Sequence, residues 1–137
     1  ALEVAKENVR INFGEDTQVN FVQGDLFESL GGAKFDLIIS NPPYVTEEEY
    51  KNLDPEVKDH EPKLALTAGA DGLDIYRRLI AQAPGYLKNQ SWLVLEIGCG
   101  QAAAVSSLLK ENGFADIYIK KDLADLDRVA AGRKKDV

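Results

Sequence analysis

The sequence predicts an α/β layered fold, because short apolar strands alternate with amphipathic helices along its 137 residues. Residues 35–40 form a near-continuous apolar run, which is typical of a strand buried on both faces in a parallel sheet. Residues 72–87 repeat apolar side chains at the spacing of one helix face, and Pro84 is placed to end the regular helix. The last two predicted strands, 117–120 and 128–132, follow one another closely and indicate a C-terminal β-hairpin.

The elements in between rest on local patterns. Apolar side chains lie on one face of residues 1–13, as in the back part of an amphipathic helix, and they alternate in residues 18–24, as in a strand. Residues 45–70 are polar and irregular, which favours a long connection of the kind that carries a lid or a substrate loop. The predicted order is a helix at 1–13, strands at 18–24 and 35–40, a short helix near 47–52, a helix at 72–87, a strand at 92–97, a helix at 101–112, and strands at 117–120 and 128–132.

The composition limits the classes of partner. A net charge of −7 disfavours nucleic acid, whose recognition depends on clustered Lys and Arg. The basic cluster Arg133-Lys134-Lys135 is expected to be a solvated tail. Cys99 is the only cysteine and His60 the only histidine, so we expect a reducing, cytoplasmic setting and no metal site. No apolar run of the sequence approaches the ~20 residues that a membrane helix needs.

Asn41-Pro42-Pro43-Tyr44 directly follows the predicted strand at 35–40 and is the most informative motif of the sequence. A primary amide nitrogen is a poor nucleophile, because its lone pair is delocalised into the carbonyl group. The side-chain oxygen of Asn41 and the backbone carbonyl of Pro42 can accept the N–H groups of such an amide, and Tyr44 can stack on its plane. The prolines stiffen the loop and contribute no N–H. The motif therefore predicts methylation of a planar, weakly nucleophilic nitrogen, with a Pro-Pro turn capped by Asn41 as the structural alternative.

Asp25 follows the predicted strand at 18–24, and ligands gather at such strand ends in α/β sheets. Its carboxylate can accept a hydrogen bond from an adenine amino group, while Leu26 or Phe27 covers the ring. A turn aspartate beside two core residues explains the same pattern, and for Asp25 taken alone this explanation is the stronger one.

Taken together, these segments resemble the HemK/PrmC family, which uses S-adenosylmethionine to methylate the side-chain amide of a glutamine in peptide-chain release factors. Asn-Pro-Pro-Tyr is shared with adenine-amino methyltransferases, so the family specificity comes from the other matching segments. These are residues 1–8, Gly24-Asp25-Leu26-Phe27, residues 35–40, Glu61-Pro62 with Ala65-Leu66, Asp71-Gly72-Leu73, Leu95-Glu96-Ile97-Gly98 with Gln101, and Asp127-Arg128-Val129.

The resemblance implies a Rossmann-like S-adenosylmethionine-dependent methyltransferase fold with a release factor as the protein substrate. It also assigns a role to each candidate site residue. These roles are binding of the glutamine amide for Asn41, Pro42, Pro43 and Tyr44, catalysis for Asn41, Pro42 and Tyr44, cofactor binding for Asp25, Leu26 and Asn41, and bracing of the loop for Glu61 and Pro62.

Several segments of the family have no counterpart in this sequence. In the family, the glycine-rich cofactor loop, the acid that grips the ribose and an N-terminal helical domain all precede the helix that opens this chain. The two missing strands lie, in the family's sheet, between the strands at 18–24 and 35–40. The sequence also has no methionine and opens inside a predicted helix. We therefore expect residues 1–137 to be the C-terminal portion of a single methyltransferase catalytic domain, with a gap in its sheet and little cofactor binding or activity alone.

Residues 95–101, Leu-Glu-Ile-Gly-Cys-Gly-Gln, offer an alternative cofactor loop. A strand that ends in Glu, followed by Gly-x-Gly and a helix N-terminus, can cradle a cofactor, and Asp122 follows the next strand where a ribose-binding acid is expected. The protein would then be a permuted adenine-amino methyltransferase acting on a flipped DNA base. The family pattern instead makes this segment a late structural strand, with Cys99 a small buried residue and His60 a surface loop residue. A non-catalytic α/β module that uses the motif as an interaction surface is the remaining alternative.

Overall fold

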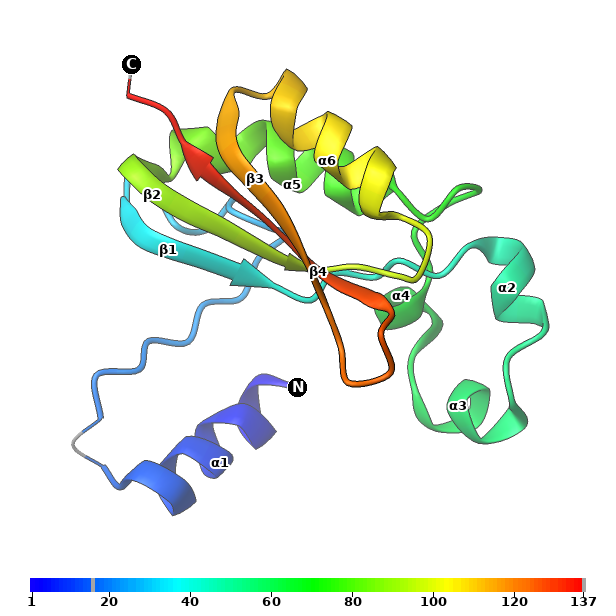
Figure 1. Cartoon of the computed structure of the whole chain (residues 1–137). Helices are drawn as coiled ribbons and strands as arrows, with labels where there is room; N and C mark the ends of the chain where they lie inside the picture. Colours follow the sequence, from blue (N-terminus) through cyan, green and yellow to red (C-terminus); the bar gives the residue numbers. More distant parts are fainter. Residues whose placement is uncertain (16, 137) are drawn as a thin grey trace. The chain divides into compact units, whose positions relative to one another are not determined.

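The computed structural model describes residues 1–15 and 17–136. The chain divides into two compact units, Ala1–Ala33 and Lys34–Val137, which Figure 1 shows in blue and in cyan to red. The first unit holds one helix and an irregular segment, and the second holds the whole sheet.

In the first unit, helix α1 (Leu2–Phe13) confirms the predicted helix and ends at Gly14, whose φ of 82° suits glycine. Residues 17–23 form no strand, so the predicted strand at 18–24 is wrong. A strand is held by hydrogen bonds to a neighbouring strand, and no segment among the described residues pairs with this one. A turn follows in which the amide of Glu28 donates to the carbonyl of Asp25 at 3.2 Å, and Phe27 is buried.

The second unit is a four-stranded mixed sheet in the order β1-β2-β4-β3. Strand β1 runs parallel to β2, while β4 runs antiparallel to both β2 and β3, which confirms the predicted C-terminal hairpin. The strands are β1 (Phe35–Ser40), β2 (Leu87–Glu96), β3 (Phe114–Lys121) and β4 (Asp127–Lys134).

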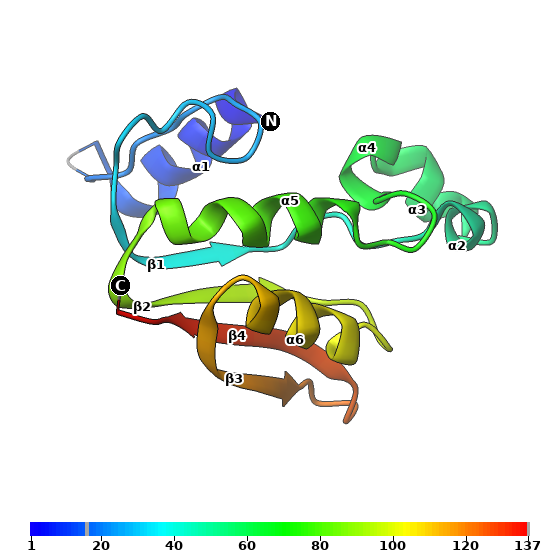
Figure 2. The same ribbon diagram turned by 90° about the horizontal axis from the view of Figure 1, so that it is seen from above.

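Two longer helices cover one face of this sheet, α5 (Asp74–Gln82) and α6 (Ala102–Glu111) (Figure 2). The 3-10 turn η1 (Ala83–Gly85) contains Pro84, which ends the regular part of α5 as predicted. The core between these helices and the sheet is largely apolar. Its largest fully buried side chains are Tyr76, Ile80, Leu87, Leu93, Leu95, Ile97, Val105, Leu109 and Phe114.

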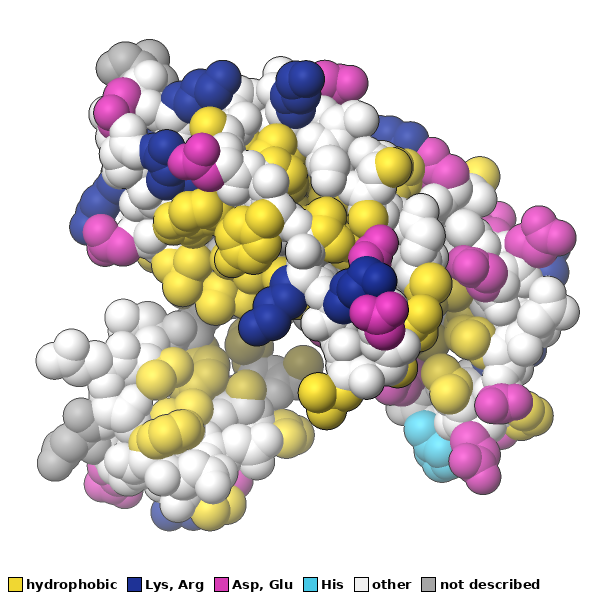
Figure 3. All heavy atoms as spheres, viewed as in Figure 1, with side chains coloured by type: hydrophobic (Ala, Val, Ile, Leu, Met, Phe, Trp, Pro, Cys, Tyr) yellow, Lys and Arg dark blue, Asp and Glu magenta, His cyan; other side chains and the backbone are white. Residues whose placement is uncertain are grey.

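The opposite face of the sheet carries apolar side chains in the open. Leu37 is 49% and Ile39 is 70% exposed, so the prediction that residues 35–40 are buried on both faces is wrong within this unit. Helices α5 and α6 cover the other face, which leaves Leu37 beside Trp92, whose ring meets that of Tyr118 edge to face, and Ile39 beside Val94. Figure 3 shows hydrophobic side chains gathered over the strands on the face in view.

The connection between β1 and α5 contains three short helices, α2 (Glu47–Lys51), α3 (Pro55–His60) and α4 (Lys63–Leu66). Helix α2 confirms the predicted helical piece near 47–52, and a capping box between Thr46 and Glu49 fixes its start. Among the described residues, no helix has the length and apolar character needed to cross a membrane.

The basic cluster near the C-terminus is part of the sheet, so the predicted solvated tail is wrong for two of its three residues. Arg133 Nε donates to the carboxylate of Asp116 at 2.6 Å. Lys134 Nζ donates to the carbonyls of Pro84 at 2.8 Å and Leu87 at 2.9 Å. Because β4 extends to Lys134, Arg133 meets Asp116 of β3, and Lys134 reaches two carbonyls just after α5 instead of lying in solvent.

Candidate functional site

The Asn41–Tyr44 loop leaves β1 at its carboxyl end, beside the carboxyl end of the parallel neighbour β2, where Ser40 pairs with Leu95. Sites in α/β sheets form at this edge. Pro42 is buried while Asn41 is exposed, so one proline anchors the loop and the amide side chain is presented outward. This is the placement that the sequence predicts for an amide-recognising loop.

Tyr44 is fixed against the end of β2. Its hydroxyl donates to Glu96 Oε1 at 3.4 Å. Its ring lies so close to Gly98 that a Cβ added there would be 3.0 Å from Tyr44 Cδ2. Burial raises the pKa of the Tyr44 phenol, and the Glu96 carboxylate raises it further. Tyr44 therefore stays neutral at physiological pH and offers an uncharged ring.

The side-chain amide of Gln101 ties three segments together. Its Oε1 accepts the amide N–H of Gly98 at 2.9 Å, and its Nε2 donates to the carbonyls of Tyr44 at 3.1 Å and Gly72 at 3.3 Å. Gly72 has a φ of +72°, and a Cβ on it would lie 2.3 Å from the Tyr44 carbonyl oxygen. Sequence reasoning gave Gln101 no role; the glycines at 72 and 98 are the only local signal that the backbones approach closely here.

The groups of the alternative cofactor loop at 95–101 are engaged in hydrogen bonds within the chain. The Gly98 N–H that would cradle a cofactor is bonded to Gln101, and the loop packs on Tyr44. Asp122 is also engaged, because the amides of Ala124 and Leu126 and the guanidinium of Arg128 donate to it. Backbone hydrogen bonding at Leu126, together with Arg128, lowers the pKa of Asp122. The loop therefore has the contacts of a brace for the Asn41–Tyr44 loop.

Two expectations about single residues around this loop have different outcomes. Cys99 is exposed, so the prediction of a small buried residue is wrong. The turn between β2 and α6 points this side chain outward while its neighbour Gly98 is buried. His60 is exposed at the end of α3, as expected for a surface residue.

Within residues 1–15 and 17–136, no group of three or more His, Cys, Asp or Glu side chains is arranged to hold a metal.

The end of β2 carries a further buried hydrogen bond. Tyr76 donates from its hydroxyl to the backbone carbonyl of Glu96 at 2.7 Å, and burial raises the pKa of this phenol. Arg128 donates to the carbonyl of Ile97 at 3.4 Å, and its pKa is raised chiefly by its hydrogen bond to Asp122. These contacts hold the strand end on which Tyr44 rests.

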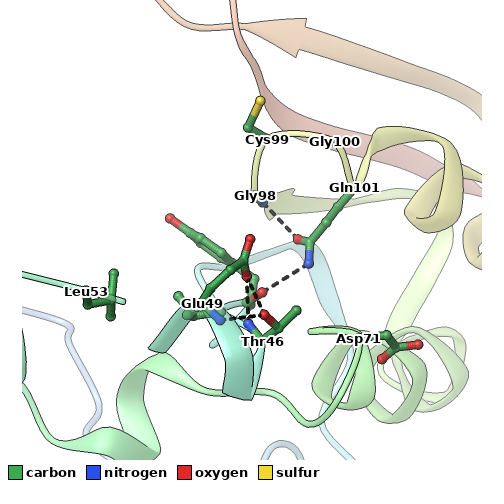
Figure 4. A pocket seen from close by; sticks show the side chains of 10 residues that line it. Thr46, Glu49, Leu53, Asp71, Gly98, Cys99, Gly100 and Gln101 are labelled. Atoms are coloured by element: carbon green, nitrogen blue, oxygen red, sulfur yellow. Dashed lines mark hydrogen bonds between the residues drawn. The ribbon is translucent and has the colours of Figure 1, made fainter. Parts of the chain in front are cut away.

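Two cavities adjoin Tyr44. One of about 230 Å³ is lined by Asn41, Pro43, Tyr44, Val45, Glu61, Ala65 and Leu66. The second, of about 470 Å³, is lined by Tyr44, Val45, Thr46, Glu49, Leu53, Asp71 and residues 98–101 (Figure 4). Glu61, expected to brace the loop, thus lies in the same cavity as Asn41. Two backbone hydrogen bonds hold Val45, the residue after the loop. Its amide donates to the carbonyl of Leu66 at 2.9 Å, and its carbonyl accepts from the amide of Ala68 at 3.0 Å.

Asp25 and Leu26 lie in the first unit and Asn41 in the second. The structure therefore describes the two parts of the predicted cofactor pocket separately. Asp25 is exposed, and Leu26 is part-buried with a φ of 52°, an uncommon conformation for a residue with a side chain. The turn that follows holds both residues at the end of an irregular segment.

Comparison with known proteins gives concordant matches. A family model described as "Methyltransferase small domain" matches residues 1–56. A release factor glutamine methyltransferase of Geobacter sulfurreducens is 45% identical over 116 residues, which make up 85% of this chain and 41% of that protein. One of Fusobacterium nucleatum is 44% identical over 135 residues, which make up 98% of this chain and 38% of that protein. The chain thus spans less than half the length of these relatives.

A solved methyltransferase from Pyrococcus furiosus matches the fold with a TM-score of 0.61 at 16% identity, over 98% of this chain and 57% of that one. This likeness confirms the predicted class, a partial Rossmann-like methyltransferase fold. The sequence matches extend over nearly the whole chain and include the Asn41–Tyr44 loop. Over most of its length the chain is therefore similar to release factor glutamine methyltransferases, the HemK/PrmC family that its motifs resemble.

Proposed function

We propose that the full-length protein containing this chain transfers a methyl group from S-adenosylmethionine to the side-chain amide nitrogen of a glutamine in a peptide-chain release factor. In this proposal residues 1–137 form the C-terminal portion of its catalytic domain and supply the part that binds the acceptor amide. The observation that carries the proposal is the exposed Asn41 on a loop that is anchored by buried Pro42 and clamped at Tyr44.

The acceptor chemistry follows from the groups on this loop. The Asn41 side-chain oxygen and the Pro42 carbonyl accept the two N–H groups of the glutamine amide. Holding these N–H groups out of the amide plane favours a pyramidal nitrogen whose lone pair is available. The neutral Tyr44 ring stacks on the amide plane. Because the loop is braced before substrate arrives, little ordering is left for the reaction itself.

The cofactor's contribution is an electrophilic methyl group. The residues assigned to it suit its adenosine part: the exposed Asp25 carboxylate can accept a hydrogen bond from the adenine amino group, and the part-buried Leu26 side chain can cover the ring. Asn41 is assigned to the cofactor as well as to the glutamine amide. The net charge of −7 favours a protein substrate over DNA. The unpaired Cys99 is compatible with a cytoplasmic setting.

The test is methyl transfer from labelled S-adenosylmethionine by the full-length protein, offered either a release factor or DNA. We expect label on the release factor, and none when its target glutamine is replaced by Ala. Asn41→Ala should abolish the transfer, whereas Asn89→Ala, which alters an exposed Asn in β2 away from both cavities, should leave it unchanged. Label on DNA alone would favour the adenine-amino alternative, and unchanged transfer by the Asn41 variant would favour a loop that only mediates interactions.

A further inference from the structure

The larger cavity at Tyr44 has no role in the proposed amide chemistry. It shares Tyr44 and Val45 with the cavity that contains Asn41, so the two adjoin along one stretch of the loop. Its volume of about 470 Å³ lies within the range of small-ligand pockets. A polypeptide whose glutamine occupies the Asn41 cavity would therefore pass this second cavity with a neighbouring residue.

Both walls of the cavity are fixed. On one wall, Thr46 and Glu49 form the capping box of α2, with hydrogen bonds of 2.8 to 3.1 Å. On the other wall, Gln101 and Gly98 are bonded to each other and to Tyr44. Figure 4 shows these two walls facing each other, with the Cys99 side chain directed away from Glu49. The cavity is thus formed before any ligand binds.

The lining of the cavity combines apolar surface with negative charge. Tyr44, Val45 and Leu53 supply the apolar part, and the part of the chain that the structure describes contributes no Lys or Arg to the lining. The Asp71 carboxylate is paired with Arg77. Among the described residues, no cation pairs with Glu49. The amide and the hydroxyl of Thr46 both donate to its Oε2. The fitting occupant is a long side chain with an apolar stem and a cationic end.

We propose that this cavity is a second substrate subsite, which binds a Lys or Arg side chain located near the methylated glutamine of the substrate protein. The inference rests on the proposed function, since it gives the same loop a second contact with the same substrate. Glu49 supplies the charge, and Tyr44 separates the cationic side chain from the reacting amide. Glu49 is a specificity-determining residue in this account and takes no part in the methyl transfer.

The test measures steady-state methylation of a release factor by the full-length enzyme. Glu49→Gln keeps a residue that can complete the capping box and removes the charge, so KM should rise about threefold with kcat unchanged. Glu49→Lys should raise KM about tenfold. Glu48→Lys makes the same charge reversal on the same helix outside the cavity, and it should change KM less than about twofold. The dissociation constant for S-adenosylmethionine should be the same in all four proteins.

A second arm identifies the occupant. Each Lys and Arg near the target glutamine of the release factor is replaced by Ala in turn, and one of these replacements should raise KM with the unaltered enzyme but have no further effect with Glu49→Gln. Equal KM changes for Glu48→Lys and Glu49→Lys would show general charge attraction and overturn the subsite. The subsite would also be overturned if both Glu49 variants methylated the release factor with an unchanged KM. A lack of release factor methylation by the unaltered enzyme would instead overturn the proposed function.

Discussion

At the scale of single residues, Tyr44 joins the structural and the chemical parts of the site. Its hydroxyl bond to Glu96 is long at 3.4 Å, while its ring contacts Gly98 and faces both cavities. We expect Tyr44→Phe to keep the ring and to lower kcat/KM of the full-length enzyme about threefold or less. Tyr44→Ala removes the stacking surface and should lower it by about thirtyfold or more. A Phe variant as impaired as the Ala variant would show that the hydroxyl, and not the ring, matters for turnover.

Tyr44 and Tyr76 also contribute to the way the free energy of unfolding responds to alkaline pH. Unfolded tyrosines ionise near pH 10, and burial raises the pKa of both residues above that value in the folded chain. Their contribution to the free energy of unfolding is therefore complete below about pH 10 and is lost as the pH rises through the raised pKa values. Urea unfolding should show this loss in the unaltered chain and a smaller one in Tyr76→Phe. At pH 7 that variant should lose about 1 kcal/mol with its hydrogen bond to the Glu96 carbonyl.

The role of a single residue can be predicted from the sequence only when its contacts lie close to it along the chain. Asn41, Pro42 and Tyr44 could be recognised because the motif and the strand before it are contiguous. Gln101 and Glu96 could not be given roles, because their contacts with Tyr44 span 57 and 52 residues. Only the fold brings these partners together. The same reason explains the wrong expectation for Cys99, whose exposure depends on how its turn leaves the sheet.

At the scale of elements, the turn between β2 and α6 acts as a clamp on the loop after β1. Substitutions of Gln101 test this clamp, because its side-chain amide bonds the N–H of Gly98 and the carbonyls of Tyr44 and Gly72. Gln101→Ala should lower the free energy of unfolding of the chain by about 1–2 kcal/mol. Gln101→Glu should be at least as harmful, because its carboxylate would face the carbonyls of Tyr44 and Gly72. Urea unfolding measures both, with Gln82→Ala on the exposed side of α5 as the control. A stable Glu variant would show that the two carbonyls do not depend on Gln101.

Elements were predictable where their stabilising partners lie within the described chain. The hairpin β3–β4, helix α6 and the end of α5 at Pro84 follow from local patterns that tertiary contacts then confirm. Strand β2 begins at Leu87, earlier than the predicted residue 92, because Leu87 pairs with Phe35. The alternating pattern at 18–24, in contrast, predicts a strand that the structure does not contain. It is compatible with a strand, but a strand needs a neighbour to bond to, and the described residues provide none.

At the scale of the whole molecule, the uneven covering of the sheet is the main physical feature. The buried core lies on the helix side of the sheet. Leu37 and Ile39 in β1 and Tyr118 in β3 each have about half or more of their surface exposed. Exposed apolar surface of this extent is typical of a surface that contacts another segment or protein.

The distribution of the cofactor residues predicts how the 137-residue chain behaves alone. The residues assigned to the cofactor are divided between the two units, with Asp25 and Leu26 in one and Asn41 in the other. The glycine-rich loop and the ribose-binding acid that the family resemblance implies have no counterpart in residues 1–137, so S-adenosylmethionine would gain few contacts to offset the entropy lost on binding. We expect isothermal titration of the isolated chain to give a dissociation constant weaker than about 1 mM, against much tighter binding by the full-length protein measured in parallel. Micromolar binding to the isolated chain would mean that it holds a complete cofactor site, and residues 95–101 would then be the first segment to test by substitution.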